Sequence, residues 1–415
     1  MIKRSIFIKL KAHLAEKEIT LMVGPRQSGK TTLMLLLQQY LQDKGEKTLF
    51  LNLDIESDRR YFSSQNDLLN KIKLEVGRGK AFIFIDEIQR KEDAGLFLKG
   101  IYDMNLDYKF IVSGSGSLEL KERVHESLAG RKRVFEVSTI NFLEFVNFKT
   151  EYKYEDRLPN FFKVEKDKAI GLLQEYLSFG GYPRVILEDT LDGKRRTIDE
   201  IYQSYLMRDI SYLLRVEKID SFSNLVKILA SQSGKLANLS ELSQTLAVST
   251  ATLRNYLWYL EKTFILNKVT PYFKNVRKEI TKSPIYYFSD LGLRNYALGT
   301  FDSFAKEKEG FLFQNFVFAI LREKIEMSTS KINFWRTKDG AEVDFVVSSG
   351  LDTLPIEVKY SSVVKPTITR SLRSFIEKYR PKEAFVVDLE TTVTLMVGET
   401  KVKIISFGDF LTMSI

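Results

Sequence analysis

The stretch from residue 24 to residue 32, GPRQSGKTT, has the residue types and the spacing that hold the phosphates of a nucleotide. Gly24 and Gly29 let backbone N–H groups wrap around phosphate oxygens, and the start of the following helix adds its favourable dipole. Lys30 is expected to reach the β- and γ-phosphates, and Thr31 to ligate Mg²⁺. The remaining residues of this predicted phosphate loop are Pro25, Arg26, Gln27, Ser28 and Thr32.

Two neighbouring carboxylates follow the apolar run FIFI. Asp86 and Glu87 therefore stand at the carboxyl end of a strand that is expected to be buried. Asp86 is expected to hold the Mg²⁺ shell, and Glu87 to polarise the attacking water. A solvated loop acid is the alternative interpretation of Glu87. Together with the phosphate loop, this pair predicts Mg²⁺-dependent hydrolysis of ATP.

Serines and arginines further along the chain are candidates for contacts with the γ-phosphate. Ser113 and Ser115 end the next expected strand, in IVSGSGS, where either hydroxyl would reach the γ-phosphate or its water. Arg123, Arg131 and Arg133 follow, and Arg131 is taken as the side chain that stabilises transition-state charge. An arginine of this kind acts on a neighbour's nucleotide, which requires a partner in trans or a ring such as a hexamer. A solvated basic face is the alternative.

A second set of charged residues lies in DGAEVDFVVSSGLDTLPIEVKY, residues 339–360. Glu357 and Lys359 are two apart on an expected strand, so their side chains point to the same face. Asp344 lies on the preceding strand of the expected hairpin, close enough to join them. Two carboxylates and a lysine are the charges that a metal-dependent nuclease needs at the ends of paired strands. Ordinary surface charges are the alternative.

The elements that carry the first set of residues alternate short apolar runs with helical periodicity, which is the pattern of a parallel α/β sheet. The near-continuous hydrophobicity of the runs indicates burial on both faces of that sheet. Its strands are expected at 18–24, 48–54, 81–86, 109–114 and 133–138.

Changes of pattern divide the chain into four expected domains. The α/β core covers 1–148, and a helical lid or connector covers 149–233. The polar beginning of that connector, 149–168, is expected to be a surface connection. A winged-helix-like domain is expected over 234–299. The last α/β domain, 300–415, is expected to run helix, three strands, helix, strand.

The segment 236–290 reads as helix, short turn, helix, followed by strands. In a DNA-binding arrangement of this kind the second helix enters the major groove, which makes Arg254 and Asn255 the groove-facing candidates. The alternative is a helix pair that packs against the core or binds protein. Candidates for contacts with DNA phosphates near the wing are Lys274, Arg277 and Lys278.

Composition narrows the classes of function. The net charge is +9, and the stretch from Lys194 to Arg294 holds 16 basic residues against 9 acidic ones, which favours a polyanionic partner such as DNA. The absence of cysteine excludes disulfides and thiolate metal sites and fits a cytoplasmic protein. Two histidines make zinc chemistry improbable, so any metal is expected to be a hard cation held by carboxylates. No apolar run is long enough to span a membrane.

With these residues in view, the chain resembles prokaryotic AAA-type ATPases that carry a C-terminal PD-(D/E)xK nuclease-like domain. The resemblance implies a P-loop core with a parallel sheet, a helical lid, a winged helix and a C-terminal α/β PD-(D/E)xK-like domain. The segments that carry it are GPRQSGKTTL, FIDEIQR, SGSGSLEL, SLAGRKRVFEVSTINFLEF, FGGYPRV, YLMRDI, IYYFSDLGLRNY and FWRTKDGAEVDFVV followed by IEVK.

The resemblance also assigns roles to residues. Pro183 of GGYP would sense the base of the nucleotide and Arg184 its phosphates, a helix-breaking turn being the alternative. Asp344 and Glu357 would bind a second divalent metal, and Lys359 would position the attacking water.

The chain departs from the family at one position. The helix before the last strands usually carries glutamate in a phrase like GxLFENFV, whereas this chain has GFLFQNFV with Gln314. An amide removes one anionic charge from a divalent cation site, which favours a module that grips DNA over one that cuts it. The first interpretation is therefore an ATP- and Mg²⁺-dependent motor or remodeller of duplex or branched DNA, assembled as a homo-oligomer. The alternatives are a nucleotide-dependent switch that engages a protein partner or a defence target, and an ATP-regulated nuclease.

Overall fold

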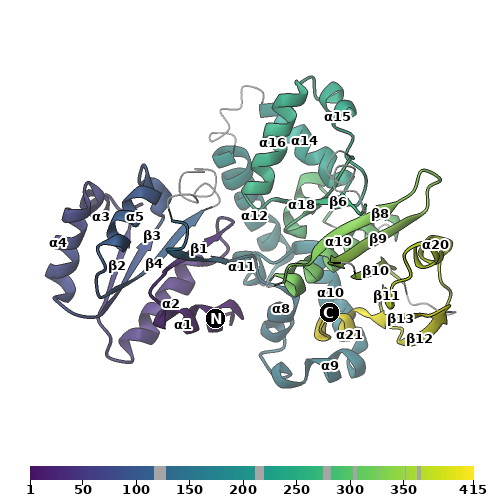
Figure 1. Cartoon of the computed structure of the whole chain (residues 1–415), viewed down its shortest axis with the longest axis horizontal. Helices are drawn as coiled ribbons and strands as arrows, with labels where there is room; N and C mark the ends of the chain where they lie inside the picture. The colour runs from purple at the N-terminus through teal and green to yellow at the C-terminus, as the bar shows by residue number, and fades with distance from the viewer. Residues whose placement is uncertain are drawn as a thin grey trace.

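The computed structural model describes residues 1–115, 128–210, 219–273, 282–301, 306–326, 328–350, 352–361 and 366–415. Two sheets lie toward opposite ends of the long axis, and helices from the middle of the chain fill the space between them (Figure 1). Within the described residues, no helix combines the length and the apolar character needed to cross a bilayer.

The N-terminal sheet has five parallel strands in the order β2-β3-β4-β1-β5. Every residue of β1 and β3 is buried, because helices cover both faces of the sheet. Alternate residues of β3 accordingly enter two different apolar clusters: Ile83 packs with α4 and α5, whereas Phe84 packs with α1 and α2. The strands are β1 (Ile19–Gly24), β2 (Thr48–Asn52), β3 (Ala81–Asp86), β4 (Tyr108–Ser115) and β5 (Lys132–Glu136), and the helices include α1 (Ile6–Ala12), α2 (Lys30–Gln42), α4 (Gln65–Val76) and α5 (Ala94–Asp103).

All five strands expected from the apolar runs are therefore present within two residues at each end, and the parallel α/β core is confirmed. The connector that follows differs in part from the expectation. Residues 149–168 contain a helix whose Phe161 and Phe162 are buried against the C-terminal core, where Phe162 meets Phe407 edge to face with 5.8 Å between ring centroids. Most residues of 149–168 are exposed, as expected for a surface connection, but Leu158, Phe161 and Phe162 anchor the stretch to the core, which the sequence did not predict. The connecting helices are α8 (Phe142–Lys149), α9 (Leu158–Val164), α10 (Lys166–Phe179), α11 (Pro183–Ile186) and α12 (Leu191–Ile201).

The middle of the chain contains the expected helix, turn and helix. α15 and α16 pack on each other through buried leucines, among them Leu242, Leu253 and Leu257. The elements of this part are α14 (Ile219–Ser231), α15 (Leu239–Thr245), α16 (Thr250–Lys262), β6 (Leu266–Pro271), β7 (Ile285–Phe288) and α18 (Leu291–Leu298).

The C-terminal sheet is mixed and has eight strands in the order β12-β13-β11-β10-β9-β8-β6-β7. The expected order of helix, three strands, helix and strand is present, and two further strands and a helix follow it. β6 pairs with β8 in parallel, so this sheet crosses the expected domain boundary at residue 300, and the domain limits stay predictions. The elements are α19 (Lys306–Ile325), β8 (Lys331–Arg336), β9 (Glu342–Ser349), β10 (Asp352–Val358), α20 (Arg370–Tyr379), β11 (Glu383–Asp388), β12 (Val393–Val397), β13 (Thr400–Ser406) and α21 (Phe407–Thr412).

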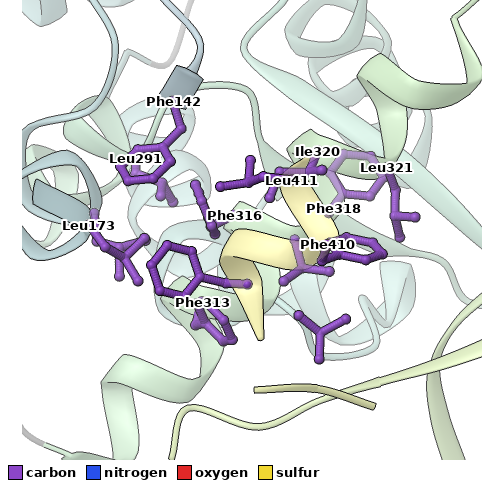
Figure 2. Packing of buried hydrophobic residues seen from close by; sticks show 14 of the residues in the cluster. Phe142, Leu173, Leu291, Phe313, Phe316, Phe318, Ile320, Leu321, Phe410 and Leu411 are labelled. Atoms are coloured by element: carbon purple, nitrogen blue, oxygen red, sulfur yellow. The ribbon is translucent and has the colours of Figure 1, made fainter. Parts of the chain in front are cut away.

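One apolar cluster joins the connector helices to the C-terminal sheet. Phe142 of α8, Leu173 of α10 and Leu291 of α18 lie around the aromatic residues of α19, and α21 contributes Phe410 (Figure 2). Phe316 of α19 meets Phe142 edge to face, with 5.1 Å between ring centroids. The middle of α19, residues 312–321, thus lies at the centre of this joint core.

Candidate functional site

The phosphate loop joins the end of β1 to the start of α2. Gly24 has φ 153°, and a Cβ atom at this position would lie 2.2 Å from the carbonyl oxygen of Val137, so only glycine fits. Gln27 (φ 59°) and Gly29 (φ 94°) also have left-handed backbone conformations. Because Lys30 begins α2, the N–H groups of the first helical turn point into the loop.

Lys30 extends back across the loop that precedes it. Its ammonium donates to the carbonyl oxygens of Gly24 at 3.1 Å and Pro25 at 2.7 Å, and the residue is 5% exposed. Burial lowers the pKa of Lys30 to about 8, although the nearby charges of Glu87 and Asp86 act in the opposite direction. The ammonium is therefore held inside the loop and is about half protonated near pH 8.

The structure brings the predicted magnesium ligands together. Thr31 Oγ1 donates to Asp86 Oδ2 at 2.7 Å, and the hydroxyl of Ser113 donates to Asp86 Oδ1. The backbone N–H of Glu87 lies 3.1 Å from Asp86 Oδ1 and 3.3 Å from Ser113 Oγ. Ser113 therefore orients the Asp86 carboxylate, a role that the sequence did not suggest. Ser115 pairs with Gly24 in the strand register, and its side chain lies outside the described part.

Glu87 follows the buried strand in a strained backbone conformation. Its φ of 56° lies in the left-handed region that residues other than glycine rarely adopt, and such outliers gather at functional sites. The amide nitrogen of Gln89 donates to Glu87 Oε2 and thereby orients the carboxylate. The sequence analysis did not assign a role to Gln89, although its position two residues after Glu87 could have suggested a contact with that carboxylate.

The GGYP segment lies beside the phosphate loop. A Cβ atom on Gly29 would be 3.9 Å from Pro183 Cγ, and Arg184 Nη1 donates to Gln27 Oε1 at 3.2 Å. Arg184 also forms an exposed ion pair with Glu200 at 3.0 Å. The structure thus places both residues next to the loop, while their assigned contacts with base and phosphates stay predictions.

A buried carboxylate that the sequence did not single out fixes this segment. Asp290, at the start of α18, accepts hydrogen bonds from the backbone N–H groups of Gly181 at 2.8 Å and Leu293 at 3.1 Å. Burial raises the pKa of Asp290 to about 6 in spite of these bonds. A Cβ atom on Gly180 would lie 2.3 Å from Asp290 Oδ1, so the glycine leaves room for the carboxylate. The SDLG stretch was part of the family resemblance but carried no assigned role.

Three other residues that the sequence predicts for the nucleotide site are placed as follows. Arg131 precedes β5 and forms an ion pair with Asp103 of its own chain at 2.7 Å, which raises the pKa of the arginine. Thr32 is exposed on the first turn of α2, and Ser28 is buried with no hydrogen-bond partner for its hydroxyl among the described residues.

The charged residues of the C-terminal sheet also come together. Asp344 Oδ1 accepts from the amide of Gln314 at 2.8 Å, and Asp344 Oδ2 accepts from the N–H of Val358 at 2.8 Å. Glu357 is 3% exposed and accepts from the hydroxyl of Thr369 through Oε1, whereas Oε2 lies 3.9 Å from the Lys359 ammonium.

In this structure these carboxylates are engaged mainly by hydrogen bonds from the protein. Burial raises the pKa of Asp344 to about 7 and also raises the pKa of Glu357. Both oxygens of Asp344 already accept N–H groups, which leaves Glu357 Oε2 as the carboxylate oxygen without a hydrogen bond. A hard cation takes six or more oxygen ligands, of which Mg²⁺ usually keeps several as water, so a second metal at these carboxylates stays a prediction. In the part of the chain that the structure describes, no three His, Cys, Asp or Glu side chains are grouped so as to hold a metal.

The candidate DNA-contacting residues divide into two groups. Arg254 and Asn255 are exposed on α16, the second helix of the pair, and their contact with a DNA groove stays a prediction. Lys274, Arg277 and Lys278 lie outside the described residues.

A parallel sheet with a glycine-rich phosphate loop and an acidic strand end defines the class of the N-terminal part, which is an AAA-type P-loop ATPase domain. In agreement, residues 16–146 match the family model described as an AAA domain. Residues 170–303 match a domain of unknown function, DUF8612, and residues 309–407 match another, DUF4143.

Relatives extend over most of the chain. An uncharacterized protein of Haemophilus influenzae is 25% identical over 373 residues, which cover 87% of each chain. An uncharacterized protein of Methanocaldococcus jannaschii is 27% identical over 356 residues, covering 84% of this chain and 75% of its own. Among solved structures, the ORC1 protein of Aeropyrum pernix in complex with DNA is 12% identical with a TM-score of 0.30, over 70% of this chain and 90% of its own.

Proposed function

We propose that the chain is a Mg²⁺-dependent ATPase that uses ATP turnover to act on duplex or branched DNA. One observation carries the ATPase assignment: Thr31 and Asp86, the two residues that a P-loop site uses for Mg²⁺, are joined at 2.7 Å beside Lys30. Glu87 stands one residue further along, where a carboxylate can polarise the water that attacks the γ-phosphate. Positioning and charge stabilisation are what phosphoryl transfer demands of a protein, and this cluster supplies both.

The proposed DNA contact is supported by the exposed polar residues of α16. Arg254 and Asn255 are accessible on a helix whose opposite face is buried against α15, the arrangement that a groove-reading helix needs. The excess of basic residues between Lys194 and Arg294 favours the same partner.

The test compares ATP turnover by the wild-type protein with that of two variants, with and without duplex and branched DNA. Lys30→Ala is expected to abolish nucleotide binding, and Glu87→Gln to retain binding while losing turnover by about 100-fold or more. DNA is expected to stimulate the wild-type rate, and its affinity to fall steeply with salt. Retained hydrolysis in Glu87→Gln would show that another group is the base. An unchanged rate and no DNA binding at moderate salt would overturn the DNA assignment.

A homo-oligomer belongs to this proposal. Arg131 is bound to Asp103 in the chain described, and it would exchange this partner for the γ-phosphate of a neighbouring subunit. Arg131→Ala and Lys30→Ala are each expected to be inactive. If the arginine acts in trans, mixing the two variants restores part of the activity, because some interfaces then combine an intact loop with an intact arginine.

A nucleotide-dependent switch is the second candidate, and the contacts of α19 favour it. Near the end of α19, Arg322 donates a hydrogen bond to Glu136 of β5, and Glu323 accepts one from Asn141 at 3.2 Å. Earlier in the same helix, Gln314 donates to Asp344 of the C-terminal sheet. Beside these contacts, a cleft of about 540 Å³ is lined both by this end of α19 and by the ATPase domain. If ATP changes the contacts of α19 while DNA has no effect on turnover, a protein partner of the C-terminal domain becomes the expected target.

A further inference from the structure

Arg4, close to the N-terminus, reaches the phosphate loop from outside. Its side chain is 8% exposed, and all three nitrogens of the guanidinium donate hydrogen bonds. Nη1 donates to the carbonyl oxygen of Ser28 at 3.1 Å, Nη2 to that of Ser138 at 2.8 Å, and Nε to the Glu144 carboxylate at 2.9 Å. One side chain therefore joins the phosphate loop, the segment after β5 and the first turn of α8.

The contact with Ser28 orients a specific peptide unit. The Ser28–Gly29 peptide is trans, so the carbonyl of Ser28 and the N–H of Gly29 point in opposite directions. A guanidinium that holds the carbonyl on the outer side of the loop consequently directs the Gly29 N–H toward the inner side, where the phosphates are expected. The left-handed conformations of Gln27 and Gly29 on either side of Ser28 make this an arrangement that needs external support.

Glu144 fixes the guanidinium in turn. Its carboxylate also accepts from the N–H of Ser5 at 2.7 Å and the hydroxyl of Ser5 at 2.8 Å. Asn141 and Glu144 form a capping box at the start of α8, so the carboxylate is attached to a rigid helix end. Glu144 therefore balances the charge of Arg4 without the phosphate loop, so the hydrogen bond to Ser28 is not needed to pair that charge.

We propose that Arg4 is a positioning residue for nucleotide phosphates, which it serves by fixing the Ser28–Gly29 peptide with the Gly29 N–H turned into the loop. This inference rests on the proposed ATP site and adds to it a residue outside the predicted motifs. A purely structural role for Arg4 would be limited to its ion pair with Glu144 and its hydrogen bonds to the carbonyl oxygens of Ser138 and Thr139.

The experiment measures kcat and KM for ATP, and the affinity for ADP, in the wild-type protein and in Arg4→Lys, Arg4→Gln and Arg4→Ala. Arg4→Gln is expected to raise KM for ATP and Kd for ADP about tenfold, the loss of one charge-assisted hydrogen bond, with kcat changed less than about threefold. Arg4→Lys keeps the charge beside Glu144 and so protects folding, but it loses the planar guanidinium that reaches several carbonyl oxygens. Its KM for ATP and Kd for ADP are expected to lie between those of the wild-type protein and of Arg4→Gln. Added guanidinium ion is expected to restore ADP affinity to Arg4→Ala.

The matched control is Lys9→Gln, which removes an exposed ion pair with Glu326 at the same junction without touching the loop, and which is expected to leave KM unchanged. Thermal unfolding of each variant separates stability from binding. Variants of Arg4 that unfold earlier yet keep the wild-type KM and Kd would reduce the residue to a structural role and overturn the inference. A wild-type protein that neither binds nor hydrolyses ATP would instead overturn the proposed function on which the inference rests.

Discussion

Gln314 of α19 donates a hydrogen bond of 2.8 Å to Asp344 of β9, and this amide joins the helix to the strand at the position where the resemblance to nuclease-like domains leads us to expect a glutamate. The other oxygen of Asp344 accepts the N–H of Val358, so each carboxylate oxygen accepts one N–H group from the protein. The residues that resemble a nuclease site are thus arranged as a hydrogen-bonded joint between α19 and the C-terminal sheet.

Gln314→Glu is expected to convert this joint into a cation-dependent one. The variant loses the hydrogen bond and sets a third carboxylate near Asp344 and Glu357, which should lower the free energy of unfolding by about 2 kcal/mol without divalent metal. Mn²⁺ should restore stability by supplying the positive charge that three carboxylates require. The measurement is thermal unfolding in EDTA and in Mn²⁺, without nucleotide.

Gln314→Met is the matched control for this substitution, since it removes the hydrogen bond while adding no charge. It should be destabilised to a similar extent and should not respond to Mn²⁺ beyond the wild-type protein. A wild-type melting temperature that rises with Mn²⁺ as much as that of Gln314→Glu would contradict the interpretation, because a cation would then already bind.

The parts that the sequence predicted correctly depend on local signals. The strands around Asp86 and Ser113 were recognisable because helices bury both faces of the sheet, which leaves uninterrupted apolar runs. The phosphate loop was recognisable because its glycines and Lys30 have a fixed spacing that the phosphates impose. Wherever burial or a ligand determines residue type over a few consecutive positions, the chain can be interpreted without its neighbours.

The parts that were missed depend on contacts between distant segments. Arg4 binds the carbonyl oxygens of Ser28 and Ser138, and carbonyl groups leave no trace in residue types. Asp290 holds the N–H of Gly181 from more than a hundred residues away. The parallel pairing of β6 with β8 likewise has no local pattern that could predict it. Such long-range polar contacts define how the domains meet, and they emerge only from the folded structure.

Ser113→Ala is expected to weaken the use of Mg²⁺ more than the binding of nucleotide. The hydroxyl of Ser113 orients Asp86 without belonging to the predicted ligands, and loss of such a supporting bond typically costs 10- to 100-fold in metal affinity. The Mg²⁺ concentration that gives half-maximal turnover should therefore rise by about tenfold or more. Ser113→Thr retains the hydroxyl and serves as the control, and an identical Mg²⁺ requirement in Ser113→Ala would contradict this role.

The affinity for ATP is expected to fall above about pH 8, because burial lowers the pKa of Lys30 to about 8. The free protein loses the ammonium proton as the pH rises through this value, whereas bound phosphates favour the charged form and retain it. Linkage then predicts a nearly constant Kd below pH 8 and a loss of about tenfold per pH unit well above it. The stability of the fold is expected to change with pH in the opposite direction to the affinity. The lowered pKa of Lys30 reduces the free energy of unfolding at neutral pH, and this reduction disappears as the pH rises from about 8 toward 10.5.

Titration calorimetry with a non-hydrolysable ATP analogue between pH 7 and 9.5 is the measurement for this prediction. Lys30→Arg should bind more weakly than the wild-type protein but with a flat pH profile, because a guanidinium stays charged throughout this range. A wild-type Kd that does not change up to pH 9.5 would show that the ammonium keeps its proton in the free protein.

Phe316→Ala is expected to weaken the joint between the connector helices and the C-terminal sheet. Phe316 is 2% exposed, meets Phe142 of α8 at 5.1 Å between ring centroids and lies 6.1 Å from the ring of Tyr176 in α10. Truncation of a buried phenylalanine leaves a cavity and should reduce the free energy of unfolding by about 3–5 kcal/mol. Val164→Ala, at an apolar side chain that is 77% exposed, is the control and should change stability by less than about 0.5 kcal/mol.

Phe316→Ala should also split a single denaturation transition into two, because the three aromatic residues come from different parts of the chain. The measurement is denaturation monitored both by circular dichroism and by the fluorescence of Trp335 and Trp258. The opposite outcome would be that both probes give the same transition and that Phe316→Ala loses no more free energy of unfolding than Val164→Ala. The ATPase and C-terminal domains would then be held together by the ion pairs of Arg322 and Lys9 rather than by this aromatic core.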